Sequence, residues 1–285
     1  MHIIVDEESV KLRVDVFASK FYPELSRSSI QRLLADNKIL VNGKEIKNKY
    51  LLKLGDAVDI EYNAEDDKKI PTVDLPIIYE DNDCVVINKP AGMLSHSKGS
   101  FNPEATVATW LSTRVKDMSG DRAGIVHRLD RATSGVMICA KTAEASTWLQ
   151  KQFSTRKVEK HYIAIVEGDI EPSEAIIDIP IGRNPKEPSK FRADVNGKAS
   201  VTHYKVIQRN DKYSLLDLKP TTGRTHQLRV HLHYLEHPIL GDPLYEGASG
   251  DRMYLHALSL DIMLPNKERM YFEVPLPDEF KAMMV

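Results

Sequence analysis

The chain has 285 residues, of which 42% are hydrophobic and 28% charged, a composition typical of a globular protein with a sizeable core. Its two cysteines, Cys84 and Cys139, each lie in an apolar run, which favours buried thiols in a reducing cytosol over a disulfide framework. No stretch approaches the ~18 apolar residues of a membrane span, and the N-terminus lacks the pattern of a signal peptide, so we expect a cytoplasmic protein.

Charge is unevenly distributed along the chain. The formal net charge of -2, taken alone, argues against a nucleic-acid-binding protein. Residues 11–53, however, hold ten Lys or Arg against four Asp or Glu, whereas residues 54–85 hold ten acidic side chains against two lysines. Such an asymmetry indicates an RNA or phosphate partner better than the total charge does.

Residues 10–62 are predicted to form a compact unit that begins with two helices. The first helix is expected to end near Phe21. Ser26 can cap the second, in which apolar residues spaced at three and four share one face.

The same unit is predicted to continue with a β-hairpin and a strand. Asn42-Gly43 separates the β-prone runs 39–41 and 44–46, and both turn residues tolerate positive φ. A strand is expected over 57–62.

An acidic, proline-containing stretch follows and is interpreted as a linker. It divides the chain into a small α/β unit at 1–66, a linker at 67–76 and one large domain at 77–285. In the large domain we expect strands at 84–88, 135–140, 162–167, 200–208 and 213–219, and helices at 106–116, 142–153 and 225–235. Because strands dominate without alternating regularly with helices, we predict an α+β domain with a mixed, largely antiparallel β-sheet flanked by helices.

The segment Gly124–Gly135 surrounds one carboxylate with cationic groups. Asp130 has Arg128 and Arg131 as close neighbours in a turn between two apolar runs. Nearby positive charge favours the ionised form of a carboxylate, which suits covalent or electrostatic catalysis on a sugar or a base, while arginines suit phosphate contacts. From spacing alone, a structural ion pair in a surface loop is an equally good interpretation.

A second polar segment, Thr221–His233, contains an arginine and several histidines. Thr222 or Gly223 can cap a helix whose first amides suit a phosphate, and Arg229 lies about one turn further on. Four histidines lie within residues 226–237, but no HExxH spacing, paired cysteines or clustered carboxylates complete a coordination shell. We therefore expect no metal.

Two further features each have a functional and a structural interpretation. Tyr162 opens a strand, where core packing is the usual role, but an aromatic ring can also stack on an unstacked base, a contact worth about 1–3 kcal/mol. The loop Arg183–Gly197 carries four basic side chains and is either an RNA-facing arm or a solvated loop. Asn88–Met93 predicts a turn and no more.

Together these segments resemble the RluA-type pseudouridine synthases. The nine residues His127–Gly135 are similar to the family signature. Ile87–Gly92, Lys160–Ala164 and Gly223–His231 match other family segments in the family's order, and His237–Asp242 follows them. The resemblance spans about residues 77–277.

The N-terminal unit resembles the small RNA-binding module named for a small-subunit ribosomal protein (the S-four type). The likeness lies in Ser26–Leu34, Val41–Gly43 and Leu54–Asp56. At Asp36-Asn37, where a Gly is common, Asn tolerates left-handed geometry, so the turn is expected to survive. The resemblance implies RNA contacts from a set of basic side chains, namely Arg27, Arg32, Lys44, Lys47 and Lys53.

The family resemblance implies a cofactor-free enzyme that isomerises uridine to pseudouridine in RNA. Asp130 is then the essential carboxylate, which attacks the ribose or the base or assists glycosidic cleavage, and Arg229 pairs with it. Tyr162 is expected to stack on the target base and to help remove its C5 proton. Arg128 is expected to support the extruded nucleotide, because a base inside a helix is inaccessible.

The target RNA and three rival functions stay open. An N-terminal RNA-binding module is typical of family members that act on large-subunit ribosomal RNA, so we expect that substrate, a monomer, and no membrane or metal partner. The alternatives are a synthase acting on tRNA, a base-releasing RNA glycosylase and a non-catalytic RNA- or ribosome-binding protein. The intact set of Asp130, Tyr162 and Arg229 speaks against the non-catalytic one.

Overall fold

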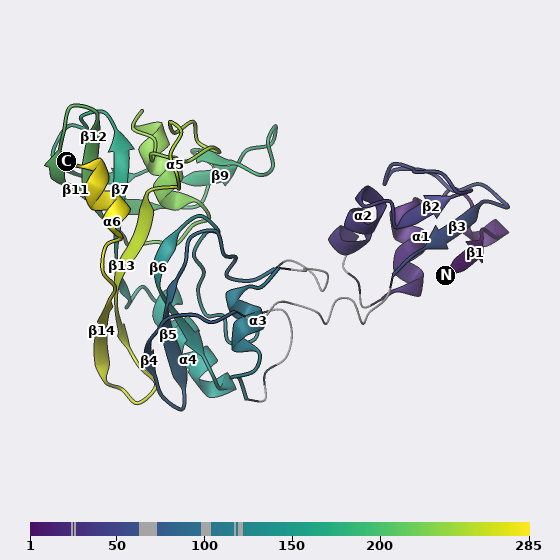
Figure 1. Cartoon of the computed structure of the whole chain (residues 1–285), viewed down its shortest axis with the longest axis horizontal. Coiled ribbons are helices and arrows are strands. Elements are labelled where there is room, and N and C mark those ends of the chain that lie inside the picture. The colour runs from purple at the N-terminus through teal and green to yellow at the C-terminus, as the bar shows by residue number, and fades with distance from the viewer. Residues whose placement is uncertain (24, 26, 63–72, 98–103, 117, 119–121) are drawn as a thin grey trace. The chain divides into compact units, whose positions relative to one another are not determined.

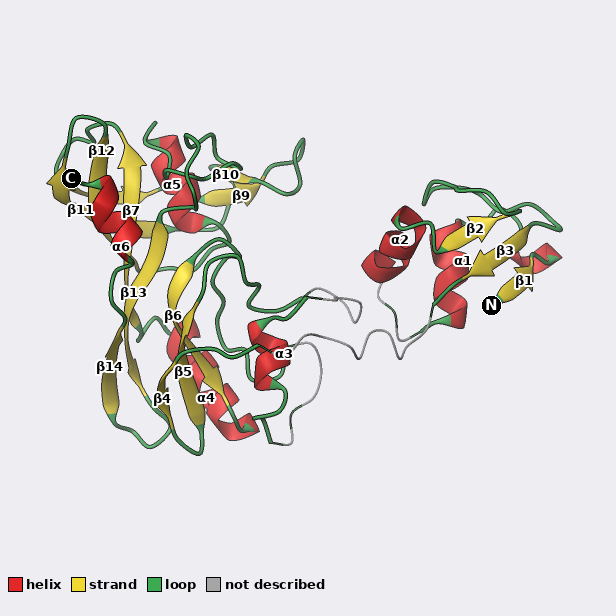
Figure 2. Cartoon of the chain, in the orientation of Figure 1, coloured by secondary structure: helices red, strands yellow, loops and turns green. Residues whose placement is uncertain are grey.

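The computed structural model describes residues 1–23, 25, 27–62, 73–97, 104–116, 118 and 122–285, and for Arg27 and Ser28 the backbone alone. The chain forms two compact units, Met1–Val73 with His96–Thr109 and Asp74–Ser95 with Trp110–Val285. Figures 1 and 2 show the helices and strands of each. Residues 67–72 of the predicted linker lie outside the described residues, so its position stays a prediction.

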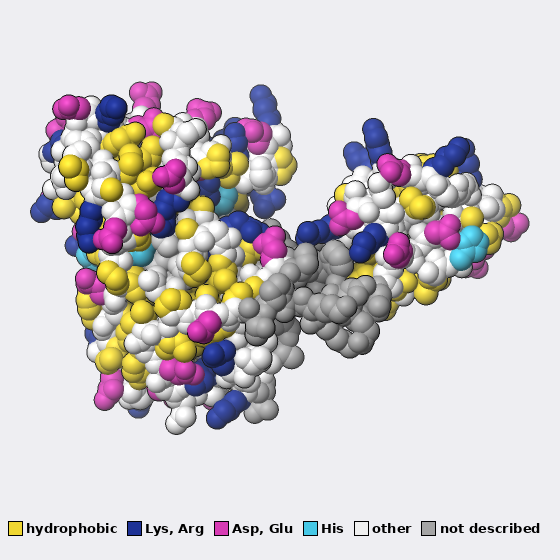
Figure 3. Space-filling model, viewed as in Figure 1, with side chains coloured by type: hydrophobic (Ala, Val, Ile, Leu, Met, Phe, Trp, Pro, Cys, Tyr) yellow, Lys and Arg dark blue, Asp and Glu magenta, His cyan; other side chains and the backbone are white. Residues whose placement is uncertain are grey.

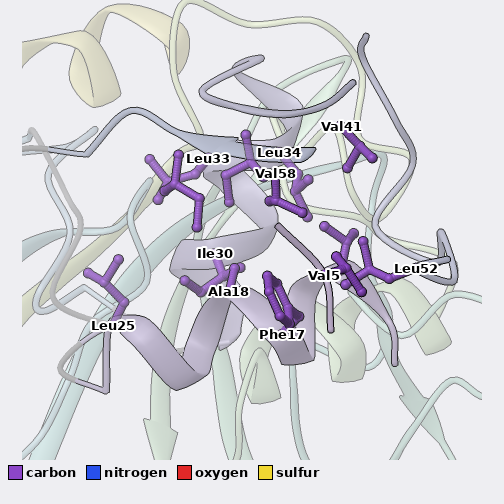
Figure 4. Packing of buried hydrophobic residues seen from close by; sticks show 13 residues of the cluster. Val5, Phe17, Ala18, Leu25, Ile30, Leu33, Leu34, Val41, Leu52 and Val58 are labelled. Carbon is purple, nitrogen blue, oxygen red and sulfur yellow. The ribbon is translucent and has the colours of Figure 1, made fainter. Parts of the chain in front are cut away.

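The smaller unit packs two helices on a three-stranded antiparallel sheet, in the order β1-β3-β2 among its described residues. Its elements are β1 (His2–Ile4), the short helix η1 (Glu7–Ser9), α1 (Val14–Phe21), α2 (Arg27–Ala35), β2 (Ile39–Val41) and β3 (Ala57–Ile60). Figure 4 shows the apolar faces of both helices meeting the sheet, with Phe17, Ile30 and Val58 among the buried side chains. Both predicted helices form, although the predicted cap, Ser26, lies outside the described residues.

The predicted β-hairpin is wrong in its second strand. Asn42 and Gly43 do take positive φ values of 53° and 70°, and Asn37 takes 57°. After the turn, however, only an isolated bridge joins Val41 to Lys44, and β2 pairs with β3 instead. The reason is burial, since β3 buries alternate apolar side chains whereas Lys44 and its neighbour are exposed.

The larger unit is built on one sheet. Its strands are β4 (Ile77–Glu80), β5 (Cys84–Lys89), β6 (Ser134–Ala140), β7 (Glu159–Glu167), β8 (Glu174–Asp178), β11 (Val201–Arg209), β12 (Tyr213–Pro220), β13 (Leu255–Met263) and β14 (Arg269–Glu273). Over the described residues they run in the order β4-β5-β6-β13-β7-β12-β11-β8, and β14 pairs with β13. Among the strands that the structure describes, only β6 and β13 are parallel neighbours, so the prediction of a mixed, largely antiparallel sheet is confirmed.

Helices α4 (Ala143–Ser154), α5 (Gln227–Tyr234) and α6 (Asp278–Met283) pack on this sheet. The strands β9 (Ile181–Arg183) and β10 (Phe191–Ala193) form a two-stranded ribbon that contacts α5, and α3 (Val107–Leu111) is a further short helix. Thr142 caps α4 by accepting a hydrogen bond from the Ala145 N–H at 3.2 Å. Leu228 and Leu232 pack α5 into the core formed with β7 and β12. Arg183 and residues 191–193 of the predicted loop 183–197 belong to this β-ribbon.

The helix predicted over 106–116 is shorter than expected. It ends at Leu111, and the Thr113 hydroxyl donates a hydrogen bond back to the Trp110 carbonyl at 3.4 Å. Such local side-chain bonds compete with helix propagation. Of the helices in the described ranges, none has both the length and the hydrophobicity needed to cross a lipid bilayer.

A close approach of two strands positions the segment that precedes β6. Gly135 has a φ of 117°, and a Cβ at this position would lie 2.1 Å from the Ala257 carbonyl oxygen of β13. Only glycine fits there. The contact brings the start of β6, and with it the loop that carries Asp130, beside the central strands of the sheet.

Candidate active site

The loop that carries Asp130 is fixed through its backbone. The Ser95 hydroxyl donates to the Leu129 carbonyl at 2.7 Å and accepts from the Leu129 N–H at 3.1 Å. The Asp130 carbonyl accepts from the Thr133 N–H at 3.1 Å. Because buried backbone groups are paired on both sides of the carboxylate, its side chain leaves the loop in a defined direction.

Lys89 binds backbone carbonyls of the same loop and of the turn that follows β5. It was not predicted as a site residue. Its side chain is fully buried, and its ammonium donates to the carbonyls of Pro90, Met93 and Arg131 at 2.9, 2.8 and 3.3 Å. Burial lowers the pKa of Lys89 to about 7, and the negative charge of Asp130 opposes that shift. The predicted turn at 88–93 therefore also supplies Lys89, which holds the loop that carries Asp130.

Arg229 connects Asp130 to a second, buried carboxylate. Its Nη1 donates to Asp130 Oδ2 at 3.1 Å, while Nε and Nη2 donate to the two carboxylate oxygens of Asp242 at 2.6 and 2.7 Å. Asp242 has no exposed side-chain surface. A two-bond pairing of this kind fixes the plane of the guanidinium, so Asp242 aims one nitrogen of Arg229 at Asp130. Asp242 was not predicted as a site residue.

A cavity of about 520 Å³ opens above Asp130. Arg128, Asp130, Tyr162 and Arg229, the four residues expected to act on the nucleotide, all line it. The Asp130 side chain is 18% exposed, and among the described residues its second oxygen, Oδ1, has no hydrogen-bond partner. A volume of this size lies in the range of small-molecule sites, so the cavity can receive a nucleotide.

Tyr162 lies between the core and the cavity. Its half-buried ring packs against the core that includes Ala164 and Leu218, and it also lines the cavity. Burial, together with the charge of Asp130, raises the pKa of Tyr162 well above its ordinary value. The phenol is therefore protonated at neutral pH, which suits stacking and hydrogen-bond donation better than proton abstraction.

Cationic side chains surround the cavity. Arg128 is exposed, and Arg156, Lys160 and Arg224 line the same space. Burial lowers the pKa of Lys160 to about 8, and its ammonium donates to the Thr222 carbonyl at 3.3 Å. Arg156 and Arg224 were not predicted as site residues, although Arg224 lies within the segment Gly223–His231 that resembles the family.

The predicted cap of the second polar segment is wrong. Helix α5 begins at Gln227, and its N-cap residue is His226, which has a left-handed φ of 57°. The side-chain oxygen of Gln227 accepts hydrogen bonds from the Thr222 hydroxyl at 2.7 Å and the Arg224 N–H at 3.0 Å. Thr222 and Gly223 thus belong to a loop folded around Gln227 and do not present the helix amides.

The histidines of this segment have separate partners. His231 is buried between the Thr202 hydroxyl and the Ile179 carbonyl, each at 3.0 Å. His237 contacts the Glu167 carbonyl at 2.7 Å. Within the part of the chain that the structure describes, no group of three or more His, Cys, Asp or Glu is arranged to hold a metal ion.

The basic side chains expected to contact RNA in the smaller unit lie on its surface, except that the Arg27 side chain lies outside the described residues. Arg32, Lys44, Lys47 and Lys53 are exposed, and Figure 3 shows Lys and Arg side chains on the surface of this unit. Buried Asp56 joins the loops that contain Asn42, Tyr50 and Lys53. It accepts hydrogen bonds from the Asn42 side chain at 2.9 Å, the Tyr50 hydroxyl at 3.1 Å and the Lys53 N–H at 2.9 Å.

Known proteins resemble both units of the chain. The family described as RNA pseudouridylate synthase matches residues 83–234, and the S4 domain matches residues 12–58. A ribosomal large subunit pseudouridine synthase D from Xanthomonas campestris pv. campestris is 34% identical, over 99% of this chain and 90% of that protein. An uncharacterized RNA pseudouridine synthase from Aquifex aeolicus is 37% identical, over 96% of this chain and 93% of that protein.

A solved structure shares the fold of the larger unit. Human RNA Pseudouridylate Synthase Domain Containing 1 superposes with a TM-score of 0.61 and 31% identity, over 72% of this chain and 85% of that one. Sequence, fold and the shared cavity of Asp130, Tyr162 and Arg229 therefore agree. The chain belongs to the RNA pseudouridylate synthase family and is an RNA pseudouridine synthase with an N-terminal S4 domain.

Proposed function

We propose that this enzyme isomerises specific uridines in large-subunit ribosomal RNA and that Asp130 is its catalytic carboxylate. One observation carries the assignment of Asp130. Its side chain lines a nucleotide-sized cavity, Arg229 binds its Oδ2, and its Oδ1 has no hydrogen-bond partner among the described residues. The choice of substrate is supported by the S4 domain and by relatives named as ribosomal large subunit pseudouridine synthases.

In the proposed reaction, Asp130 attacks the flipped uridine or assists cleavage of the bond between ribose C1′ and base N1. The base then rotates and rejoins C1′ through its C5, and the C5 proton is lost to a base or to solvent while N1 gains one. Substrate and product contain the same atoms, so the reaction needs no redox or group-transfer cofactor. Arg229 keeps the carboxylate oriented, and Tyr162 stacks on the base.

Extruding the nucleotide costs a few kcal/mol of stacking and pairing free energy. Phosphate contacts by the cationic side chains around the cavity offset this cost, and we assign Arg128, Arg156, Lys160 and Arg224 to such contacts. Arg128 is exposed and is our candidate to support the RNA next to the extruded nucleotide. A ribosomal substrate goes with a cytoplasmic location.

The substrate assignment is tested by mapping pseudouridines. Carbodiimide treatment followed by reverse transcription gives stops at pseudouridines, and the maps of cells with and without the gene are compared. We expect particular stops in large-subunit ribosomal RNA to vanish without the gene and to return with the wild-type gene but not with Asp130→Asn. Stops that vanish only from tRNA would reassign the substrate, and free uracil with abasic RNA would indicate a glycosylase.

A triple substitution tests the proposed RNA contacts of the smaller unit. Lys44, Lys47 and Lys53 are exposed, so replacing all three with Gln is expected to leave folding unchanged. Each lost phosphate contact removes about 0.7–0.9 from the slope of log binding constant against log salt concentration, so the slope should flatten by about 2 to 3. Filter binding of ribosomal RNA fragments over a salt series measures it.

The matched control replaces three exposed lysines of the larger unit, Lys212, Lys267 and Lys281, with Gln. None of them lines the cavity above Asp130. A change in slope that is equal for the two triple variants would show that the lysines of the smaller unit have no special part in binding.

A further inference from the structure

We propose that His226 is a further substrate-contacting residue of this site, which donates a hydrogen bond from its Nε2–H to an acceptor oxygen of the bound uridine. We also propose that Tyr245 is a positioning residue that fixes the tautomer of His226. Both parts rest on the proposed function of the cavity above Asp130. Neither residue was identified from the sequence as part of the site.

The placement of His226 is the first argument. Its ring lines the same cavity as Asp130, and its Nε2 lies 3.9 Å from Asp130 Oδ2. That distance is too long for a hydrogen bond, and Nε2 has no other partner among the described residues. His226 has a left-handed backbone conformation, with a φ of 57°. Such a conformation is uncommon outside glycine and is often found at functional sites.

The tautomer follows from the partners of the Tyr245 hydroxyl. This oxygen accepts a hydrogen bond from the Phe191 N–H at 2.9 Å and lies 2.8 Å from His226 Nδ1. The tyrosine is 2% exposed. If Nδ1 carried the proton, the buried hydroxyl would accept twice and its own proton would have no acceptor among the described residues. The hydroxyl therefore donates to Nδ1, and the proton of the neutral ring is on Nε2.

Burial favours the neutral form of the His226 ring. The carboxylates of Asp130 and Asp242 and the guanidinium groups of Arg229 and Arg128 act on the same ring. Burial has the largest effect and lowers the pKa of His226, while Asp130 and Asp242 raise this pKa and Arg229 and Arg128 lower it. The guanidinium carbon of Arg229, Cζ, also lies over the Tyr245 ring, 4.9 Å from the ring centre. One tyrosine thus supports both the arginine and the histidine that border Asp130.

A neutral donor beside the catalytic carboxylate can act on the uridine without competing with Arg229 for Asp130. The acceptor is either a uracil carbonyl oxygen or the ribose 2′-hydroxyl, both of which lie near the bonds that change. A preorganised donor of this type contributes about 10²–10³-fold to kcat when its partner gains charge in the transition state.

Two amide substitutions distinguish the effect of the position of the hydrogen-bond donor from the effect of losing the imidazole ring. In His226→Gln the side-chain NH₂ reaches about as far as Nε2, whereas in His226→Asn it reaches only about as far as Nδ1. We expect kcat of His226→Asn to fall about 100-fold with KM within several-fold, and His226→Gln to stay within about 10-fold of the wild type. The substrate is the RNA fragment whose pseudouridine vanishes in the mapping experiment.

The same RNA with 2′-deoxyuridine at the target position identifies the acceptor. If Nε2–H binds the 2′-hydroxyl, His226→Asn and the wild type should react at the same rate on the deoxy substrate. If it binds the uracil, the roughly 100-fold difference should persist. Equal activity of His226→Asn and His226→Gln on the natural RNA would overturn the proposal.

Spectroscopy tests the part of Tyr245. Long-range ¹H–¹⁵N correlation spectra of the full-length enzyme report which ring nitrogen of His226 carries the proton. We expect Nε2–H in the wild type and a mixture of tautomers in Tyr245→Phe, which keeps the ring but removes the hydroxyl. A wild-type spectrum with Nδ1–H, or with a doubly protonated ring at neutral pH, would refute the assignment.

Asp130→Asn distinguishes failure of this inference from failure of the proposed site. If Asp130→Asn is inactive while His226→Asn is fully active, only the role of His226 is lost. If Asp130→Asn retains activity, the site itself is misassigned, and the result for His226 has no bearing on a contact with uridine there.

Discussion

Asp130→Asn is expected to abolish pseudouridine formation, with a loss in rate on the order of 10⁴-fold or more. The substitution keeps the shape of the side chain and lets its amide oxygen accept the bond from Arg229 Nη1. It removes the negative charge and replaces the second carboxylate oxygen with an amide nitrogen, which is a poor nucleophile. Single-turnover conversion of a target RNA measures the rate.

The affinity of Asp130→Asn for RNA is expected to stay within several-fold of the wild type. The cationic side chains around the cavity and the lysines of the smaller unit are unchanged, and they supply the phosphate contacts that dominate affinity. Asp217→Asn is a suitable control, because Asp217 pairs with His161 and does not line the cavity. Substantial turnover by Asp130→Asn would remove Asp130 from its proposed role.

Local sequence signals predicted the elements that hold Asp130. Helix α4 forms close to its predicted bounds, 142–153, and the apolar runs of β5 and β6 are buried strands. These features depend on neighbours in the sequence, such as a capping hydroxyl or a continuous run of apolar residues. The mixed sheet followed from the same kind of pattern.

One strand prediction failed for lack of information on its pairing partner, and one central strand, β13, was not predicted. Nothing near Asn42-Gly43 indicates that β2 would prefer β3 over the run that follows the turn. Strand β13 lies beside β6 and β7 near the centre of the sheet, yet it buries His256 and Ser259 among its apolar residues. A strand that buries polar residues shows neither a clean alternation nor a continuous apolar run.

The supporting residues of the site could not be found from spacing. Asp242 is a single acidic residue after an apolar run, and only the fold brings it within 2.7 Å of Arg229 Nη2. In the sequence, Lys89 looks like an ordinary turn residue. One of its three carbonyl partners, Arg131, belongs to a distant segment, and only the fold brings the two together. A single polar residue beside apolar neighbours gives only a weak indication of a functional site. The resemblance of His237–Asp242 to a family segment strengthens that indication but assigns no role to Asp242.

Arg229→Met is expected to lower both the free energy of unfolding and the rate. The substitution leaves Asp242, which has no exposed side-chain surface, as an unpaired buried charge. Breaking a buried ion pair by removing one partner costs about 3–5 kcal/mol. Asp130 at the same time loses the group that orients it. Urea unfolding and single-turnover assays measure the two effects.

A charge-balanced double variant separates these two effects. In Arg229→Met/Asp242→Asn no unpaired charge remains at the buried position, so most of the lost free energy of unfolding should return. Activity should not return, because Asp130 Oδ2 still lacks the donor that lies 3.1 Å away in the wild type. Arg229→Lys provides the graded case, since an ammonium keeps the charge but cannot bind both Asp242 oxygens and Asp130 with fixed geometry. If the double variant recovered stability and activity together, Arg229 would serve the fold alone and would have no part in orienting the catalytic carboxylate.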